Sequence, residues 1–236
     1  PSTVQEAYDL AIKGVYLSER FRAPVTILMD TFIGHLREKI RLRSPEELPS
    51  IERPRPKVLP KEYKCYQPDD RGVPPMADFG GPYRSKILGN MHDEGGKYSR
   101  NPKVFENLIR RLRDKILKYP EEYEFLERIH MEDADIAIFA YGTPSRAAKT
   151  AIRMARESGI RAGLVRPTTV WPFPLNAVSK IAERVGHFLV VEMNLGQMVL
   201  EVERAVCGKS KVSFLGSVGG VTLSPGEILQ KIKEVL

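Results

Sequence analysis

One loop of this sequence brings an imidazole and two carboxylates together. His92, Asp93 and Glu94 are adjacent and are followed by two glycines. Such groups can coordinate a divalent ion or relay protons. Adjacent residues rarely converge on one ion, and the loop has a single imidazole, so we expect no metal ligand here. The three residues remain cleft or interface candidates; loop ordering, a place at a substrate entrance and a plain solvated turn all stay open.

A second cluster lies where a strand is expected to pass into a helix. Residues 141–146 read Tyr-Gly-Thr-Pro-Ser-Arg. The backbone N–H groups of a helix start, with Thr143 and Arg146 beside them, suit an anion such as a phosphate of a nucleotide or of coenzyme A. The segment lacks the spacing of the glycine-rich phosphate loops. Thr143 and Arg146 are therefore cofactor-binding candidates, with an ordinary strand-to-helix turn as the alternative.

A third candidate pair follows a short apolar run. Residues 24–30 (PVTILMD) have the pattern of a buried parallel strand, with Asp30 at its carboxyl end, where open α/β sheets place ligands. His35 follows five residues later, and the two side chains could meet near a cofactor cleft or line a subunit contact. The alternative is that Asp30 caps the helix that comes next.

The remaining candidates lie after two predicted strands. Glu192, Asn194 and Gln197 surround a strand-to-helix junction, and Glu192 needs a partner in its otherwise apolar strand, for which we expect Arg166. We interpret this group as structural or interfacial. Trp171 lies between prolines in an apolar loop, where it would anchor a neighbouring subunit or be buried in its own domain. None of these positions is predicted to be catalytic.

The elements that position these residues alternate regularly in the second half of the chain. Such alternation predicts an α/β fold with an open, mostly parallel sheet and helices on both faces. The predicted strands are 135–141, 162–166, 188–193 and 212–215; the predicted helices are 144–158, 175–185, 196–206 and 225–235.

The first half of the chain is less regular. A capping box formed by Thr3 and Glu6 predicts a helix that opens almost at the first residue. Residues 43–82 contain half of the prolines and should form a long connector without regular structure. Apolar periodicity returns over 102–118, which predicts a helix ended by Pro120.

The composition is that of a globular protein. No run of apolar residues approaches the length of a membrane span, and no export signal is visible, so we expect a cytoplasmic protein without a membrane partner. The net charge of +7 comes from basic residues that alternate with glutamates, which favours a solvated face over a nucleic-acid site. Cys65 and Cys207 form no CxxC pair, which argues against a disulfide scaffold or a metal–thiolate site within this chain.

Four longer stretches can be compared with a known family. They are residues 29–38 (MDTFIGHLRE), 91–95 (MHDEG), 166–174 (RPTTVWPFP) and 191–198 (VEMNLGQM). Together, and in this order, they resemble the α subunits of 2-oxoacid:ferredoxin oxidoreductases, in particular the 2-oxoglutarate type. The resemblance extends over essentially the whole chain and corresponds to the carboxy-terminal part of such a subunit.

The resemblance implies three regions. Residues 1–42 would be the end of a thiamine-diphosphate pyrimidine-binding domain, 43–101 an interdomain connector, and 102–236 a transketolase carboxy-terminal-like domain. The glutamate that engages the aminopyrimidine ring in this family has no equivalent here. The resemblance therefore implies that the chain binds no cofactor alone.

The activity implied is oxidative decarboxylation of a 2-oxoacid to an acyl-CoA with reduction of ferredoxin. Thiamine diphosphate, Mg²⁺ and an iron–sulfur cluster would belong to the full hetero-oligomer, with a β subunit and further γ and δ subunits as partners; ferredoxin and coenzyme A would meet this chain only through that complex. The chain would be an inactive scaffold by itself. Two alternatives stay open: a coenzyme A- or nucleotide-binding module, and a standalone transketolase-like enzyme.

Overall fold

The computed structural model describes residues 1–50 and 53–236. The chain forms two units. The sheet unit comprises residues 1–8, 28–41 and 123–236, and the connector unit comprises residues 9–27 and 42–122. The domain boundaries expected from the sequence, at 42 and 101, remain predictions.

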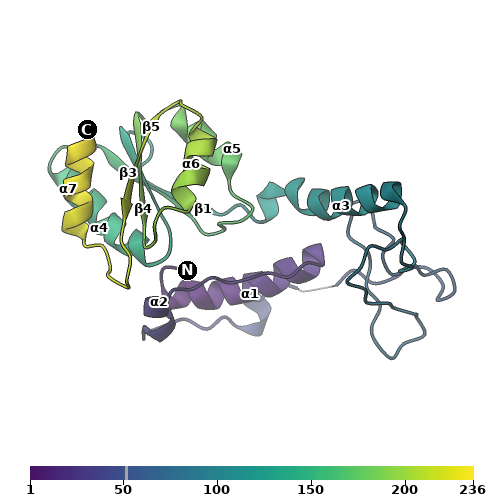
Figure 1. Ribbon diagram of the computed structural model, residues 1–236. Helices are drawn as coiled ribbons and strands as arrows, with labels where there is room; N and C mark the ends of the chain where they lie inside the picture. The colour runs from purple at the N-terminus through teal and green to yellow at the C-terminus, as the bar shows by residue number, and fades with distance from the viewer. Residues whose placement is uncertain (51–52) are drawn as a thin grey trace. The chain divides into compact units, whose positions relative to one another are not determined.

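Five strands form the centre of the sheet unit (Figure 1). They are β1 (Leu126–Ile129), β2 (Ile136–Ala140), β3 (Ala162–Pro167), β4 (His187–Glu192) and β5 (Lys211–Gly216), in the spatial order β1-β3-β2-β4-β5. The last four run parallel, and β1 pairs antiparallel with β3 at the edge. The predicted α/β class and mostly parallel sheet are therefore confirmed.

Helices cover both faces of this sheet. Alternate residues of each strand point to opposite sides, so Ile136 and Ile138 of β2 pack under α4 (Gly142–Glu157) and α7 (Pro225–Val235). Phe139 of the same strand points to the other side, under α5 (Leu175–Ala182) and α6 (Met198–Val206). Figure 1 shows the two helix pairs on either side of the strands. The central strands β2, β3 and β4 are fully buried, and the points where they end determine where the site residues lie.

One predicted strand is absent, and one strand was not predicted. Residues 24–30 are extended but form no ladder, because within the described parts of the chain no strand lies beside them. Val25 and Ile27 instead approach Gly14 of α1 (Val4–Phe21). The strand β1 was missed because its four residues, with two charges among them, carry little of the apolar pattern that marks the central strands.

The connector unit contains little regular structure. Among its described residues, the elements besides part of α1 are two 3₁₀ turns, η1 (Pro45–Glu47) and η2 (Pro120–Glu122), and the helix α3 (Pro102–Leu117), which the sequence predicted. Lys115 of α3 is buried, and its Nζ donates to the backbone oxygens of Phe21 and Arg22, at 2.8 Å each. A single lysine thereby holds the end of α1 against α3.

No helix within residues 1–50 and 53–236 is long and apolar enough to cross a membrane.

Candidate functional site

The carboxyl ends of β2 and β4 form the natural site of this fold. The two strands are adjacent and parallel, but the chain leaves β2 through α4 on one face and leaves β4 through α6 on the other. Open α/β sheets bind ligands in the crevice at such a switch point. The sequence candidates Thr143 and Arg146 follow β2, and Glu192, Asn194 and Gln197 lie at the end of β4.

Glu192 is fully buried at this point, with 0% of its surface exposed. One carboxylate oxygen accepts from Tyr141 Oη at 3.0 Å, Asn194 Nδ2 at 2.8 Å and the N–H of Met198 at 3.0 Å. The other accepts from the N–H of Val199 at 2.9 Å. Glu192 thus ties the end of β4 to the first turn of α6, where the helix leaves N–H groups without internal partners.

The prediction that Glu192 pairs with Arg166 was wrong. Arg166 does not pair with Glu192; it donates to Glu6 at 2.6 and 3.0 Å and also contacts Glu127. Tyr141 takes the place of arginine, and burial together with the Glu192 carboxylate raises the pKa of its phenol. A neutral hydroxyl at the end of β2 is therefore the contact that joins the two strand ends.

Asn194 shapes the loop between β4 and α6. Its Oδ1 accepts from the N–H groups of Gly196 at 2.7 Å and Gln197 at 3.2 Å, and its Nδ2 donates to Tyr141 Oη at 3.2 Å. Gly196 has a φ of +96°, which a side chain would strain. The side chain of Gln197 points to solvent. The loop geometry is therefore fixed by Asn194, and Gln197 contributes its backbone.

The first turn of α4, after β2, already binds a carboxylate of the chain itself, that of Asp30. Asp30 Oδ2 accepts from the backbone N–H of Thr143 at 3.0 Å and from its hydroxyl at 2.6 Å. Gly142, with a φ of +58°, allows this approach, because a Cβ there would lie 3.2 Å from the same oxygen. Burial alone would raise the pKa of Asp30, but the hydrogen bonds from Ile33 and Thr143 lower it. Asp30 therefore binds as a carboxylate.

Asp30 also caps α2 (Thr31–His35), which confirms the helix-cap alternative. Its Oδ1 accepts from the N–H of Ile33 at 2.9 Å. His35 is the exposed last residue of α2, and its predicted meeting with Asp30 remains a prediction. Arg146 is engaged as well, since its Nη1 donates to the Ser2 carbonyl at 2.9 Å and to Glu38 at 3.0 Å. An external phosphate at Thr143 and Arg146, which stays a prediction, would have to displace these contacts.

Two large apolar side chains lie exposed in loops at the same edge of the sheet. Trp171, after β3, is 73% exposed, and Leu195, after β4, is 86% exposed. The alternative in which Trp171 is buried in its own domain is thus wrong. Neighbouring Phe173 is the residue that enters the core, where it packs on Phe139.

The loop of His92, Asp93 and Glu94 lies in the connector unit and is ordered by its own residues. Asp93 Oδ1 accepts from the N–H groups of Gly95 at 3.0 Å and Lys97 at 2.9 Å, and these bonds lower the pKa of Asp93. His92 is buried and stacks on Tyr66 with 3.8 Å between ring centroids. The loop-ordering alternative describes this geometry, while a place at a substrate entrance stays a prediction.

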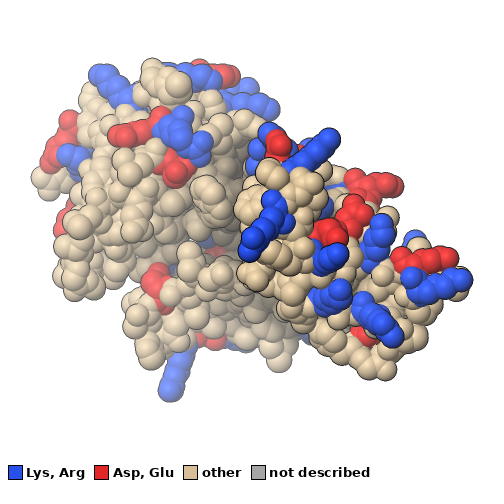
Figure 2. Space-filling model, turned by 45° about the vertical axis from the view of Figure 1, so that its right-hand side comes forward, with Lys and Arg blue, Asp and Glu red and all other residues tan. Residues whose placement is uncertain are grey.

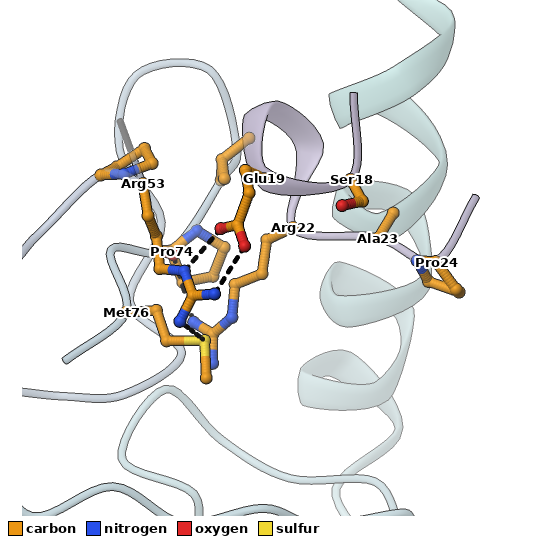
Figure 3. A pocket seen from close by; sticks show the side chains of 10 residues that line it. Ser18, Glu19, Arg22, Ala23, Pro24, Arg53, Pro74 and Met76 are labelled. Carbon is orange, nitrogen blue, oxygen red and sulfur yellow. Dashed lines mark hydrogen bonds and ion pairs between the residues drawn. The ribbon is translucent and has the colours of Figure 1, made fainter. Parts of the chain in front are cut away.

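A pocket of about 350 Å³ also lies in the connector unit (Figure 3). Two of its charged lining residues form an ion pair, in which Arg53 donates to Glu19 through two hydrogen bonds of 2.5 Å. The sequence did not indicate this pocket, because these two residues lie 34 positions apart. Arg22, beside them, donates to the carbonyls of Cys65 and Pro74. The lining residues are Ser18, Glu19, Arg22, Ala23, Pro24, Arg53, Pro54, Val73, Pro74 and Met76.

Comparison with known proteins places both halves of the chain in one family. Residues 1–110 match the model for the pyruvate flavodoxin/ferredoxin oxidoreductase thiamine-diphosphate-binding region, and residues 134–228 match that for pyruvate:ferredoxin oxidoreductase core domain II. The 2-oxoglutarate synthase subunit KorA of Methanothermobacter thermautotrophicus is 42% identical over 233 residues, which cover 98% of this chain and 61% of that subunit. The chain belongs to the 2-oxoacid:ferredoxin oxidoreductase family.

Further relatives support the same family. KorA of Methanocaldococcus jannaschii is 39% identical over 97% of this chain and 60% of its own length. The 2-oxoglutarate:ferredoxin oxidoreductase of Magnetococcus marinus, solved with 2-oxoglutarate, coenzyme A and succinyl-CoA bound, has the same fold, with a TM-score of 0.84 and 21% identity over 99% of this chain and 41% of that one. The chain thus spans about three fifths of the length of the curated family members it matches.

Glu192 does not fit the role of holding the thiamine diphosphate of this family. Tautomerising its aminopyrimidine ring needs a carboxylate that is buried and uncommitted. Glu192 is the one fully buried carboxylate within residues 1–50 and 53–236, and four donors already saturate it. Within the same ranges, no group of three or more His, Cys, Asp or Glu side chains is placed to hold a metal ion.

The surface of this family member mixes both signs of charge. Figure 2 shows lysines and arginines interspersed with aspartates and glutamates over the visible face. Many are paired: Arg161 donates to Asp135 at 2.6 Å, and Arg156 donates to Asp133 at 2.6 Å. Positive charge is therefore neutralised locally at these positions.

Proposed function

We propose that this chain is part of the α subunit of a thiamine-diphosphate-dependent 2-oxoacid:ferredoxin oxidoreductase, in which it serves mainly as scaffold and subunit interface. The complete enzyme would convert a 2-oxoacid and coenzyme A to an acyl-CoA and CO₂, with two electrons passed to ferredoxin. The 42% identity to a 2-oxoglutarate synthase subunit carries this proposal and favours 2-oxoglutarate as the substrate.

The geometry supports a scaffold role. The polar side chains at the switch point hold one another: Glu192 binds Tyr141 and Asn194, and Asp30 binds Thr143. The two cysteines, Cys65 and Cys207, are both free thiols in different units. Thiamine diphosphate, Mg²⁺ and an iron–sulfur cluster would accordingly be held elsewhere in a cytoplasmic complex with a β subunit and further γ and δ subunits.

Activity measurements test the scaffold role. The purified chain is mixed with thiamine diphosphate, Mg²⁺, 2-oxoglutarate, coenzyme A and the dye methyl viologen as electron acceptor. We expect no 2-oxoglutarate-dependent reduction of the dye. Turnover by the chain alone would contradict the scaffold role and favour a standalone enzyme.

Binding to an immobilised β subunit tests the interface. Trp171 and Leu195 present apolar surface that a neighbouring subunit would cover. We expect Trp171→Ala or Leu195→Ala to weaken binding about tenfold, the order of one buried aromatic or leucine side chain. Leu200→Ala, at an exposed leucine on α6, is the control. Unchanged binding in both loop variants would remove these residues from the interface, and no binding by the unmodified chain would remove the partner.

A further inference from the structure

The helix α3 carries an apolar stripe that its own unit leaves exposed. Phe105, Ile109 and Leu112 are 44%, 46% and 40% exposed, and Ile116 is half-buried. Their spacing of four, three and four residues places them along one side of the helix. Lys115 faces the interior of the connector unit instead. A stripe of this kind on a soluble protein marks a contact surface.

We propose that α3 pairs antiparallel with α3 of a second copy of this chain, through Phe105, Ile109, Leu112 and Ile116. The pattern is symmetric about the midpoint between Arg110 and Arg111. Reversing the helix direction exchanges Phe105 with Ile116 and Ile109 with Leu112. A two-fold axis through that midpoint therefore brings each apolar residue opposite another, as an isologous interface requires. This contact between copies goes beyond the proposed function.

Charges along the stripe favour the same arrangement. Glu106 and Arg113 are seven residues apart and so flank the same side of the stripe. In an antiparallel pair, the flank that carries Glu106 and Arg113 in one copy faces the same flank of the other copy. Glu106 of one copy then lies near Arg113 of the other, offset by two residues or about 3 Å along the helix, and the reverse. Within one chain, Glu106 pairs with Arg110 at exposed positions, and exposed Arg113 pairs with half-buried Asp114. Such exposed pairs contribute little and exchange readily.

The size of the surface sets the expected strength. A helix of 16 residues is about 24 Å long and offers four apolar side chains, which is less than a standard interface. We expect the isolated contact to be weak. The dimer should therefore appear only as the protein concentration rises.

Sedimentation velocity of the 236-residue chain at increasing concentration tests the proposal. We expect a monomer–dimer equilibrium that Leu112→Glu shifts at least tenfold toward monomer. Leu200→Glu, at an exposed position of α6, is the matched control and should leave the equilibrium unchanged. Circular dichroism verifies that both variants are folded. A chain that stays monomeric at every concentration, or a dimer that tolerates Leu112→Glu, would overturn the proposal.

A charge swap tests the antiparallel direction. Glu106→Arg and Arg113→Glu should each weaken the dimer several-fold, because each places like charges opposite one another. The double variant restores opposite charges at both ends and should recover the original affinity. Failure of the double variant to recover would overturn the proposed pairing, since its single substitutions are exposed and far from the fold's interior.

Discussion

The sheet unit and the connector unit satisfy their backbone polar groups in different ways. In the sheet unit, neighbouring strands pair the N–H and C=O groups of β2, β3 and β4, and apolar side chains fill both faces. In the connector unit, cationic side chains donate to backbone carbonyls: Lys115 to Phe21 and Arg22, Arg22 to Cys65 and Pro74. A proline-rich segment has few N–H donors, so side chains must supply them.

This difference determines what each unit is sensitive to. The sheet unit depends on buried apolar volume, which pH and salt hardly change. The connector unit depends on side-chain charges whose protonation and pairing respond to both. Substitutions of matched size in the two units therefore separate the two sources of stability.

The largest effect is expected from the core of the sheet unit. Phe139 is fully buried between β3, β4 and α5, so Phe139→Ala should lower the free energy of unfolding by about 4 kcal/mol. Urea unfolding followed by circular dichroism measures this. Phe79→Ala in the connector unit, at an exposed phenylalanine, should change it by less than about 0.5 kcal/mol. Equal effects in the two variants would refute the contrast.

The second-largest loss of stability is expected at the polar junction at the end of β4. Glu192→Gln keeps the volume but turns one acceptor into a donor that faces Tyr141, Asn194 and the first turn of α6. Leaving these buried donors unpaired should lower the free energy of unfolding by about 3 kcal/mol. Glu203→Gln, at an exposed position of α6, is the control in the same urea experiment. A loss below about 1 kcal/mol would mean that water replaces the carboxylate.

The same junction illustrates how far the sequence predicts the site. The need of Glu192 for a partner followed from its place in an apolar strand, and the cap by Asp30 followed from its place before a helix. The identity of the partner did not follow. Tyr141 reaches Glu192 because β2 and β4 are adjacent, and strand order is a tertiary property that one sequence does not display.

The errors in the predicted fold also arise because strand pairing is a tertiary property. Residues 24–30 have the composition of a strand, yet strand formation depends on a neighbour rather than on the segment itself. The edge strand β1 forms despite its charges, because β3 offers a free ladder and Glu127 pairs with Arg166. The central strands and their helices were predictable since their burial on both faces leaves a continuous apolar pattern.

A smaller effect is expected at the ion pair of Glu6 and Arg166, one of the charged contacts of the sheet unit. Burial alone would raise the pKa of Glu6, but the hydrogen bonds from Arg166 and Ser2 lower it to about 2. The carboxylate therefore stabilises the fold above its ordinary pKa of 4.5, and this contribution is lost as the pH falls from 4.5 toward 2. Glu6→Gln should lower the free energy of unfolding by roughly 2 kcal/mol at pH 7.

Urea titrations at pH 7 and pH 3 check this prediction. The difference between the unmodified chain and Glu6→Gln should shrink at pH 3, because the unfolded chain, with a Glu6 pKa near 4.5, then binds a proton that the folded chain, with a pKa of about 2, still lacks. Glu157→Gln, at an exposed end of α4, serves as control. A difference that is the same at both pH values would show that the variant acts through shape.

The smallest effect at neutral pH, with the opposite pH dependence, is expected at Lys115. Burial, together with the neighbouring Arg111 and Arg22 charges, lowers the pKa of Lys115 to about 8. Lys115→Met removes the donor to two carbonyls but also removes a buried charge, so the free energy of unfolding should fall by only about 1 kcal/mol at pH 7.

Raising the pH then separates the two contributions. Between the folded pKa of about 8 and the ordinary value of 10.5, the unfolded chain holds a proton that the folded chain has released, so stability rises with pH. The neutral amine still donates to Phe21 and Arg22. The gap between the unmodified chain and Lys115→Met should therefore widen from pH 7.5 to pH 10, whereas Lys118→Met, at an exposed lysine, shows no such trend. If the difference in unfolding free energy stayed constant with pH, Lys115 would behave like an exposed lysine. That result would contradict the proposed difference between the two units.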